Sequence, residues 1–166
     1  MVTTGRPAAE VMKAAVTHVE RFLDKGAVAK RGTIVLATVY GDVHDIGKNL
    51  VRAILANNGY AVHDLGKQVP VSAIVEKAEE VKADIIALSC LLSPSMYYQK
   101  DVITYLKDTG ARDKYLIMVG GAPVTQEWVQ EIGSDGYART ALEAAEVAKQ
   151  LIKKKMKFYV IDAISL

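Results

Sequence analysis

The sequence predicts an α/β fold in which helices cover both faces of a parallel, five-stranded sheet. The chain has 166 residues, of which 51% are hydrophobic, and this is enough for one domain with a single core. After a helical opening, the apolar residues alternate five times between strand-like and helix-like periodicity. The links between these segments are short, which favours consecutive βα units that share one sheet.

The chain opens with a predicted amphipathic helix from about Ala8 to Leu23, which ends near Gly26. Apolar residues recur on one face of this helix at positions Val11, Met12, Ala15, Val19 and Phe22. A face of this kind needs a partner surface.

The first two βα units are predicted from β-branched runs that are each followed by a helical pattern. A strand over Thr33–Val39 precedes a helix over about Ile46–Asn58. A second strand over Tyr60–Leu65 precedes a helix that begins after Pro70 and ends near Val81.

The next units continue the alternation. The third strand is Asp84–Ser89, and its helix follows Pro94 and ends near Thr109. The fourth strand is Tyr115–Val119 and ends at a glycine pair.

A short fifth strand includes Gly136 and Tyr137, and the last helix spans about Thr140–Lys154. We therefore expect a helical segment over residues 1–30, a sheet domain over residues 31–157 and an apolar, β-prone tail over residues 158–166. The regular alternation predicts a doubly wound parallel sheet in the flavodoxin-like (Rossmann-like) order.

Composition narrows the classes of function. The formal net charge is +2, so there is no strong electrostatic reason to expect nucleic acid or an anionic membrane as a partner. The single cysteine, Cys90, excludes an internal disulfide, and the chain opens without a secretory signal pattern. No apolar run approaches the length of a membrane span. A cytoplasmic protein is the simplest expectation.

Polar and glycine-rich loops follow four of the predicted strands. They are Asp42–Gly47, Ser89–Ser95, Gly120-Gly121 and Gly136–Ala138. Because the carboxyl ends of parallel strands share one edge of a sheet, these loops should face the same crevice. Open α/β folds bind their ligands in that crevice.

The first of these loops contains the pattern DxHxxG, formed by Asp42, His44 and Gly47. The carboxylate can hold one imidazole nitrogen, and the glycine removes a side chain from the approach. This pattern indicates a histidine that is presented to a large metal cofactor. The structural alternative is a loop histidine that caps the next helix beside Asp45.

The other loop residues also have two interpretations each. Cys90 is expected to be a small buried hydrophobe and not a nucleophile, because no base lies near it in the sequence. Ser89, Ser93 and Ser95 either form turns and helix caps or contact a ligand. Gly120-Gly121 forms a tight turn, clears space for a flat group, or does both.

Several familiar ligand sites do not match these loops. A phosphate loop fails because five residues separate Gly41 from Gly47, and Asn49 stands where Ser or Thr is required. No GxGxxG follows the first strand, and Ser89 stands where a phosphoacceptor domain has an aspartate. The candidate zinc ligands lack the usual spacing; they are His18, His44, His63 and Cys90.

These motifs resemble the cobalamin-binding domain family. DxHxxG, the SxL of Ser89-Cys90-Leu91, and the glycine pair occur in the family's order and at similar strand ends. The strings GDVHDIGKN, LLSPSM, VGGAPVTQ and DGYA are similar to the corrinoid proteins of methylamine and methanol methyltransferase systems and to the cobalamin module of methionine synthase. The resemblance covers about residues 10–155.

The resemblance implies a cobalamin or related corrinoid bound base-off, with its dimethylbenzimidazole tail in a deep slot beside the sheet. His44 would be the lower axial ligand of cobalt, and Asp42 and Ser95 would complete a proton relay. Ser89 and Ser93 would line the slot. The other cofactor-binding residues that it implies are Gly41, Val43, Asp45, Ile46, Gly47, Leu91, Gly120, Gly121 and Ala138.

The resemblance also implies a methyl carrier that has little turnover alone. In such proteins cob(I)alamin takes a methyl group, and methylcobalamin yields it to a second nucleophile. The partners would be a substrate-specific methyltransferase and a second, methyl-accepting methyltransferase. The methyl donor would be selected by the partner that covers the upper face of the corrin.

The N-terminal segment is shorter than the helical bundle with which such carriers cap the corrin. We therefore expect a partner, a second copy of the chain or a missing domain to cover the upper face. Two other functions share these motifs and stay open. One is the cobalamin module of an adenosylcobalamin-dependent mutase. The other is a non-enzymatic cobalamin sensor or storage module with the tail after Phe158 as a docking segment.

Overall fold

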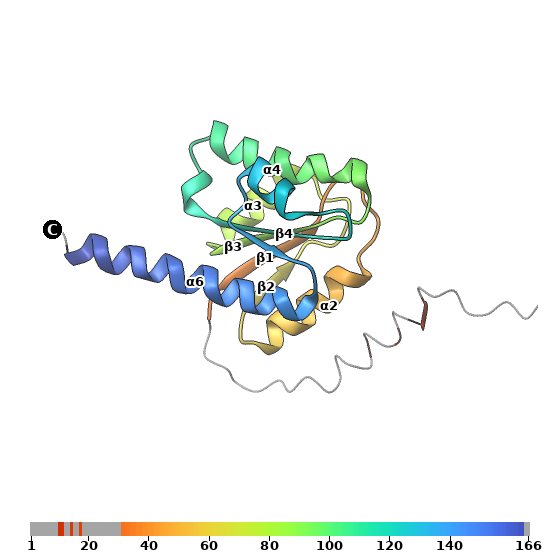
Figure 1. Ribbon diagram of the computed structural model, residues 1–166, viewed down its shortest axis with the longest axis horizontal. Coiled ribbons are helices and arrows are strands. Elements are labelled where there is room, and N and C mark those ends of the chain that lie inside the picture. Colours follow the sequence, from red (N-terminus) through yellow and green to blue (C-terminus); the bar gives the residue numbers. More distant parts are fainter. Residues whose placement is uncertain (1–9, 12–13, 15–16, 18–30, 165–166) are drawn as a thin grey trace, which may run out of the picture.

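The computed structural model describes residues 10–11, 14, 17 and 31–164, and it contains a parallel five-stranded sheet (Figure 1). The strand order is β2-β1-β3-β4-β5, which confirms the flavodoxin-like prediction. The order places a topological switch point between β1 and β3, where open α/β folds bind ligands. The strands are β1 (Thr33–Thr38), β2 (Ala61–Asp64), β3 (Ile85–Ser89), β4 (Leu116–Gly120) and β5 (Gly136–Ala138).

Helices cover both faces of the sheet, as Figure 1 shows. The α-helices in the described part from residue 31 onwards are α2 (Ile46–Asn57), α3 (Val71–Glu80), α4 (Met96–Asp108), α5 (Gln126–Ile132) and α6 (Ala141–Ile164). Helices α2 and α6 pack on one face, and α3, α4 and α5 pack on the other. Side chains alternate along each strand, so Val35 lies in the core under α3 and α4, whereas Leu36 lies under α2 and α6.

Two elements differ from the prediction. Helix α5 was not expected, because it is short; its signals are Thr125, whose side chain accepts the Trp128 N–H, and Gly133, which ends the helix with φ 74°. The tail over residues 158–166, which was predicted to be β-prone, is helical as far as Ile164, where α6 ends. No glycine or proline interrupts this helix, and β-propensity depends strongly on packing context.

The N-terminal helix that was predicted over Ala8–Leu23 lies largely outside the described residues. Glu10, Val11, Ala14 and Thr17 are described, and all of them are helical. Among the described residues, no helix has both the length and the apolar character that crossing a bilayer requires.

Candidate functional site

The loop between β1 and α2 holds His44 at the carboxyl edge of the sheet. The buried hydroxyl of Thr38, the last residue of β1, donates to the His44 carbonyl at 3.1 Å. A turn closes where the Asp42 N–H donates to the Val39 carbonyl at 3.2 Å, and Gly41 supplies the positive φ of 77° within it. The backbone of His44 is thus fixed, while 46% of its side chain stays exposed.

The Asp42 carboxylate is completely buried and accepts hydrogen bonds on both oxygens. Oδ1 accepts the His44 backbone N–H at 3.0 Å and pairs with His44 Nδ1 at 2.8 Å. Oδ2 accepts the backbone N–H groups of Leu91 at 2.6 Å and Leu92 at 3.0 Å. Burial alone would raise the pKa of Asp42, but these hydrogen bonds outweigh it and hold the pKa well below its ordinary value of 3.8.

A permanently ionised Asp42 determines the tautomer of His44. Because the carboxylate only accepts hydrogen bonds, Nδ1 must carry the proton that it shares with Asp42. The lone pair of the neutral ring then lies on Nε2. An exposed imidazole whose other nitrogen is bound to a carboxylate is the usual form of a metal-ligating histidine.

Ser95 joins the same network from the other loop. Its buried hydroxyl lies 2.9 Å from Asp42 Oδ2 and 2.7 Å from the Leu92 carbonyl, and both of these are acceptors. A hydroxyl has one hydrogen, so Ser95 can donate to either acceptor but not to both at once. The short helical turn Ser93–Ser95, which follows β3, positions this residue.

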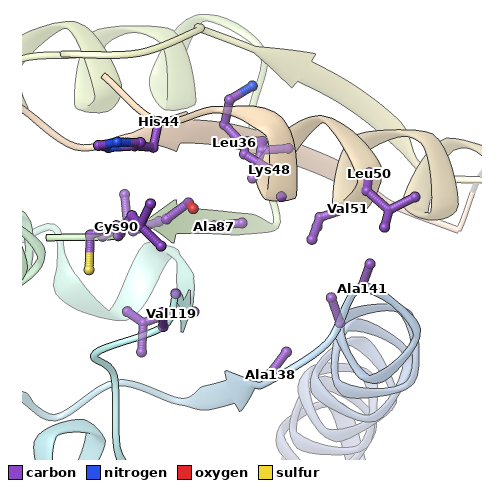
Figure 2. Close-up of a pocket in the computed structure, with 18 of the residues that line it drawn as sticks. Leu36, His44, Lys48, Leu50, Val51, Ala87, Cys90, Val119, Ala138 and Ala141 are labelled. Carbon is purple, nitrogen blue, oxygen red and sulfur yellow. The ribbon is translucent and has the colours of Figure 1, made fainter. Parts of the chain in front are cut away.

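A cavity of about 460 Å³ begins beside His44 and extends between the sheet, α2 and α6 (Figure 2). Its sheet wall has two layers. The upper layer is Ser89, Gly120 and Ala138, which are paired in register across β3, β4 and β5. The lower layer is Leu36, Ala87 and Met118, which are paired in register across β1, β3 and β4.

The helices form the opposite wall. On α2, a Cβ atom added to Gly47 would meet nothing within 4 Å, so this position opens into free space. Lys48 also lines the cavity, but its Nζ is bound to Asp64 Oδ1 at 2.6 Å and to Asn49 Oδ1 at 2.8 Å. Ala141 and Ala144 contribute the small side chains of α6.

A family model for the B12 binding domain matches residues 32–146. The chain belongs to the B12-binding domain family. This membership makes cobalamin or a related corrinoid the cofactor class of the site.

Individual relatives agree with this assignment. The B12-binding domain is 48% identical to dimethylamine corrinoid protein 3 of Methanosarcina mazei, over 87% of each chain. It resembles the solved monomethylamine corrinoid protein of Methanosarcina barkeri with a TM-score of 0.77 and 34% identity, covering 87% of this chain and 66% of that one. It also resembles a chain of the methanol:cobalamin methyltransferase complex of Methanosarcina barkeri, with a TM-score of 0.70 and 32% identity. The matched regions are 86% of this chain and 55% of that chain.

The residues of this B12-binding domain fit a corrinoid. His44 presents an exposed imidazole nitrogen, and the cavity beside it is within the range of roughly 300–1,000 Å³ that is usual for small-molecule sites. Its layers are built mainly from small or aliphatic side chains, which suits the apolar base of a nucleotide tail.

Most of the residues expected from the sequence surround this cavity. Those that line it are Val43, His44, Asp45, Ile46, Gly47, Ser89, Leu91, Gly120, Gly121 and Ala138. Asp42 and Ser95 lie behind His44, and Gly41 is an exposed residue of the supporting turn. Ser93 is exposed and lies outside the cavity wall, so its contact with the cofactor stays a prediction.

The sequence-based prediction did not include the remaining residues that line the cavity. The missed residues are Leu36, Lys48, Leu50, Val51, Ala87, Leu88, Cys90, Met118, Val119, Ala122, Arg139, Thr140, Ala141 and Ala144. Strand alternation could have found Ala87 and Met118, because each lies two positions before an upper-layer residue and faces the same side.

The glycine pair has a packing role in addition to its place in the wall. A Cβ on Gly121 would lie 1.7 Å from the Cys90 carbonyl oxygen, and a Cβ on Gly120 would lie 2.9 Å from the Ala138 carbonyl oxygen. The pair therefore lets the backbone at the end of β4 approach the neighbouring backbone of Cys90 and Ala138 closely.

The structure confirms that Cys90 is buried. Burial, together with repulsion from Asp42, raises the pKa of its thiol to about 12, so the thiolate is not populated at neutral pH. His63 is an exposed residue of β2. Within the described ranges, no group of three metal-binding side chains is arranged around one point.

Proposed function

We propose that this chain is a corrinoid carrier that shuttles a methyl group between methyltransferase partners, with His44 as the lower axial ligand of cobalt. The observation that carries the proposal is the pairing of His44 Nδ1 with the buried Asp42 at 2.8 Å beside a cavity of about 460 Å³. A bound corrinoid supplies a cobalt centre that accepts and releases methyl groups. The similarity to methylamine and methanol corrinoid proteins supports methyl transfer.

His44 Nε2 would donate its lone pair to the metal, while Asp42 would hold the ring in the required tautomer. A carboxylate partner orients a metal-bound imidazole and strengthens it as a donor. Proton uptake by the set Asp42, His44 and Ser95 would be linked to ligation of the metal. Asp42 would keep its negative charge, because the Leu91 and Leu92 amides hold its pKa low.

Ser95 would adjust this proton balance. When His44 is neutral, the Ser95 hydroxyl can donate to the Leu92 carbonyl or to Asp42. Donation to Asp42 would give the carboxylate one more hydrogen bond. Ser95 would therefore act in the relay through its contact with Asp42.

The cavity would hold the nucleotide tail away from cobalt, which leaves the lower coordination position for His44. Gly47 would provide the clearance on α2, and Ala138 and Ala141 would provide it near the start of α6. The residues of the wall would exclude water from the tail, because the lower layer is apolar.

The partners would be a substrate-specific methyltransferase and a second, methyl-accepting methyltransferase. One solved relative comes from a methanol:cobalamin methyltransferase complex, which supports the first of these partners. The upper face of the corrin would be covered by such a partner or by a second copy of the chain, and the donor would be selected there.

The test is methyl transfer to the corrinoid-loaded, reduced protein by purified methylamine or methanol methyltransferases. We expect methylation of wild type and of His63→Ala, whose exposed side chain lies on β2. We expect slower methylation, or loss of the cofactor, in His44→Ala. Equal methylation of all three proteins would contradict the role of His44, and tight corrinoid binding without methylation by any of these enzymes would contradict the carrier function.

A further inference from the structure

The lower layer of the cavity wall is apolar, and the polar lining residues Ser89, Arg139 and Thr140 lie towards the mouth. The lower wall consists of Leu36, Ala87 and Met118 from the sheet, with Val51 on α2 and Ala144 on α6. None of these five side chains has a strong hydrogen-bonding group. Two residues before Leu36 and Ala87, the paired residues Ile34 and Ile85 are fully buried in the core.

The charged group near this wall is already paired. Lys48 is 2% exposed, and its Nζ is held by Asp64 and Asn49 at 2.6 Å and 2.8 Å. A ligand could recruit Nζ only by breaking a buried ion pair, which is strongly unfavourable. Ser89 belongs to the upper layer, and Thr140 precedes the first residue of α6, so both lie towards the mouth.

From this arrangement we propose that the cavity selects corrinoids by the base of their nucleotide tail and favours a benzimidazole over a purine. The inference rests on the proposed function, because it places the tail in the cavity. Both bases contain an imidazole ring, so this ring does not change their relative affinity for the cavity. The second ring differs: in dimethylbenzimidazole it is a hydrocarbon, whereas in adenine it carries ring nitrogens and an amino group.

Burial beside the lower wall would leave the adenine groups without partners. An unsatisfied buried donor or acceptor weakens binding by about tenfold to a hundredfold. The benzo ring and its methyl groups instead gain apolar contacts with Met118, whose flexible side chain can adapt to the shape of the base.

The experiment is calorimetric titration of the protein with cobalamin, with the adeninyl cobamide and with cobinamide, which lacks the base. We expect wild type to bind cobalamin about tenfold or more tightly than the adeninyl cobamide. Met118→Gln, which places an amide in the lower wall at nearly constant volume, should reduce this ratio, and Met118→Leu should keep it. Ala144→Ser provides a second polar variant if Met118→Gln does not fold.

The outcomes separate the two proposals. Equal wild-type affinities for the two cobamides would overturn the selectivity and leave corrinoid binding intact. A ratio that is unchanged in the folded polar variants would overturn its assignment to the lower wall. Failure of all three corrinoids to bind, cobinamide included, would overturn the proposed function as well.

Discussion

Asp42 and His44 are joined twice through one oxygen, because Oδ1 of Asp42 accepts the His44 backbone N–H at 3.0 Å and pairs with Nδ1 of its ring at 2.8 Å. The backbone contact fixes the loop, and the ring contact fixes the imidazole. The remaining oxygen binds the loop after β3 through Leu91 and Leu92. One buried carboxylate therefore couples the orientation of the candidate metal ligand to the packing of two loops that are far apart in the sequence.

Replacing Asp42 with asparagine should destabilise the fold. An asparagine amide can accept on one side only, so its NH₂ group would face either the His44 donors or the Leu91 and Leu92 donors. We expect a loss of about 1–3 kcal/mol in the free energy of unfolding. Urea unfolding measures it, with Asp45→Asn as the control, because Asp45 makes no side-chain cap bond to α2. An equal loss in both variants would contradict the account.

The stabilisation by Asp42 should depend on pH. Its pKa in the folded protein is depressed below the ordinary value of 3.8, so its contribution is present above that value and disappears as the pH falls through the folded pKa. The difference in unfolding free energy between wild type and Asp42→Asn should shrink as the pH falls below about pH 4. Taking the difference between the two proteins removes the contributions of the other carboxylates, because both proteins contain them. A difference that stays constant down to pH ~3 would be incompatible with the hydrogen bonds that Asp42 accepts.

Gly47 should tolerate a side chain in the free protein but not in the loaded one. A Cβ there meets nothing within 4 Å, and glycine inside a helix is less favourable than alanine by about 0.5–1 kcal/mol. We expect Gly47→Ala to be slightly more stable than wild type. Gly47→Leu should fold but bind cobalamin at least about tenfold more weakly, because its side chain enters the cavity. Calorimetric titration and thermal unfolding measure both effects. Undiminished binding in Gly47→Leu would show that the tail lies elsewhere.

Gly121 should behave in the opposite way. It has a φ of 129°, and a Cβ there would overlap the Cys90 backbone. Gly121→Ala should lower the unfolding free energy by about 2 kcal/mol or more, through a forced separation of the loops after β3 and β4. Thermal unfolding of Gly121→Ala and Gly47→Ala measures this effect. The two variants are a matched pair, because their expected changes in unfolding free energy have opposite signs. An unchanged midpoint for Gly121→Ala would refute the close approach.

The local parts of this structure were predictable from the sequence. Strands followed the β-branched runs, and the loops at their carboxyl ends met at one edge because a parallel sheet places them there. The pairing of Asp42 with His44 followed from their spacing of two residues. What was missed depends on contacts between distant segments. Met118 lines the cavity only because β4 aligns in register with β3, and Leu91 and Leu92 reach Asp42 only through the packing of two loops.

Two further differences have local causes. Helix α5 has seven residues, which is too few to show a convincing apolar period. Only the capping residues that flank it, Thr125 and Gly133, identify it. Helix α6 continues through a β-branched run to Ile164, because a helix already formed by the preceding residues extends at little cost.

We propose above that His44 is the axial ligand of the cofactor metal. Electron paramagnetic resonance of the corrinoid-loaded protein in the cobalt(II) state tests it most directly, because the axial nitrogen splits the cobalt signal. With histidine labelled by the heavy nitrogen isotope, we predict that the splitting pattern changes in wild type and in His63→Ala, and that the histidine splitting is absent in His44→Ala. A pattern that is unaffected by the label would mean that the axial nitrogen belongs to the corrinoid's own base, and it would contradict the account.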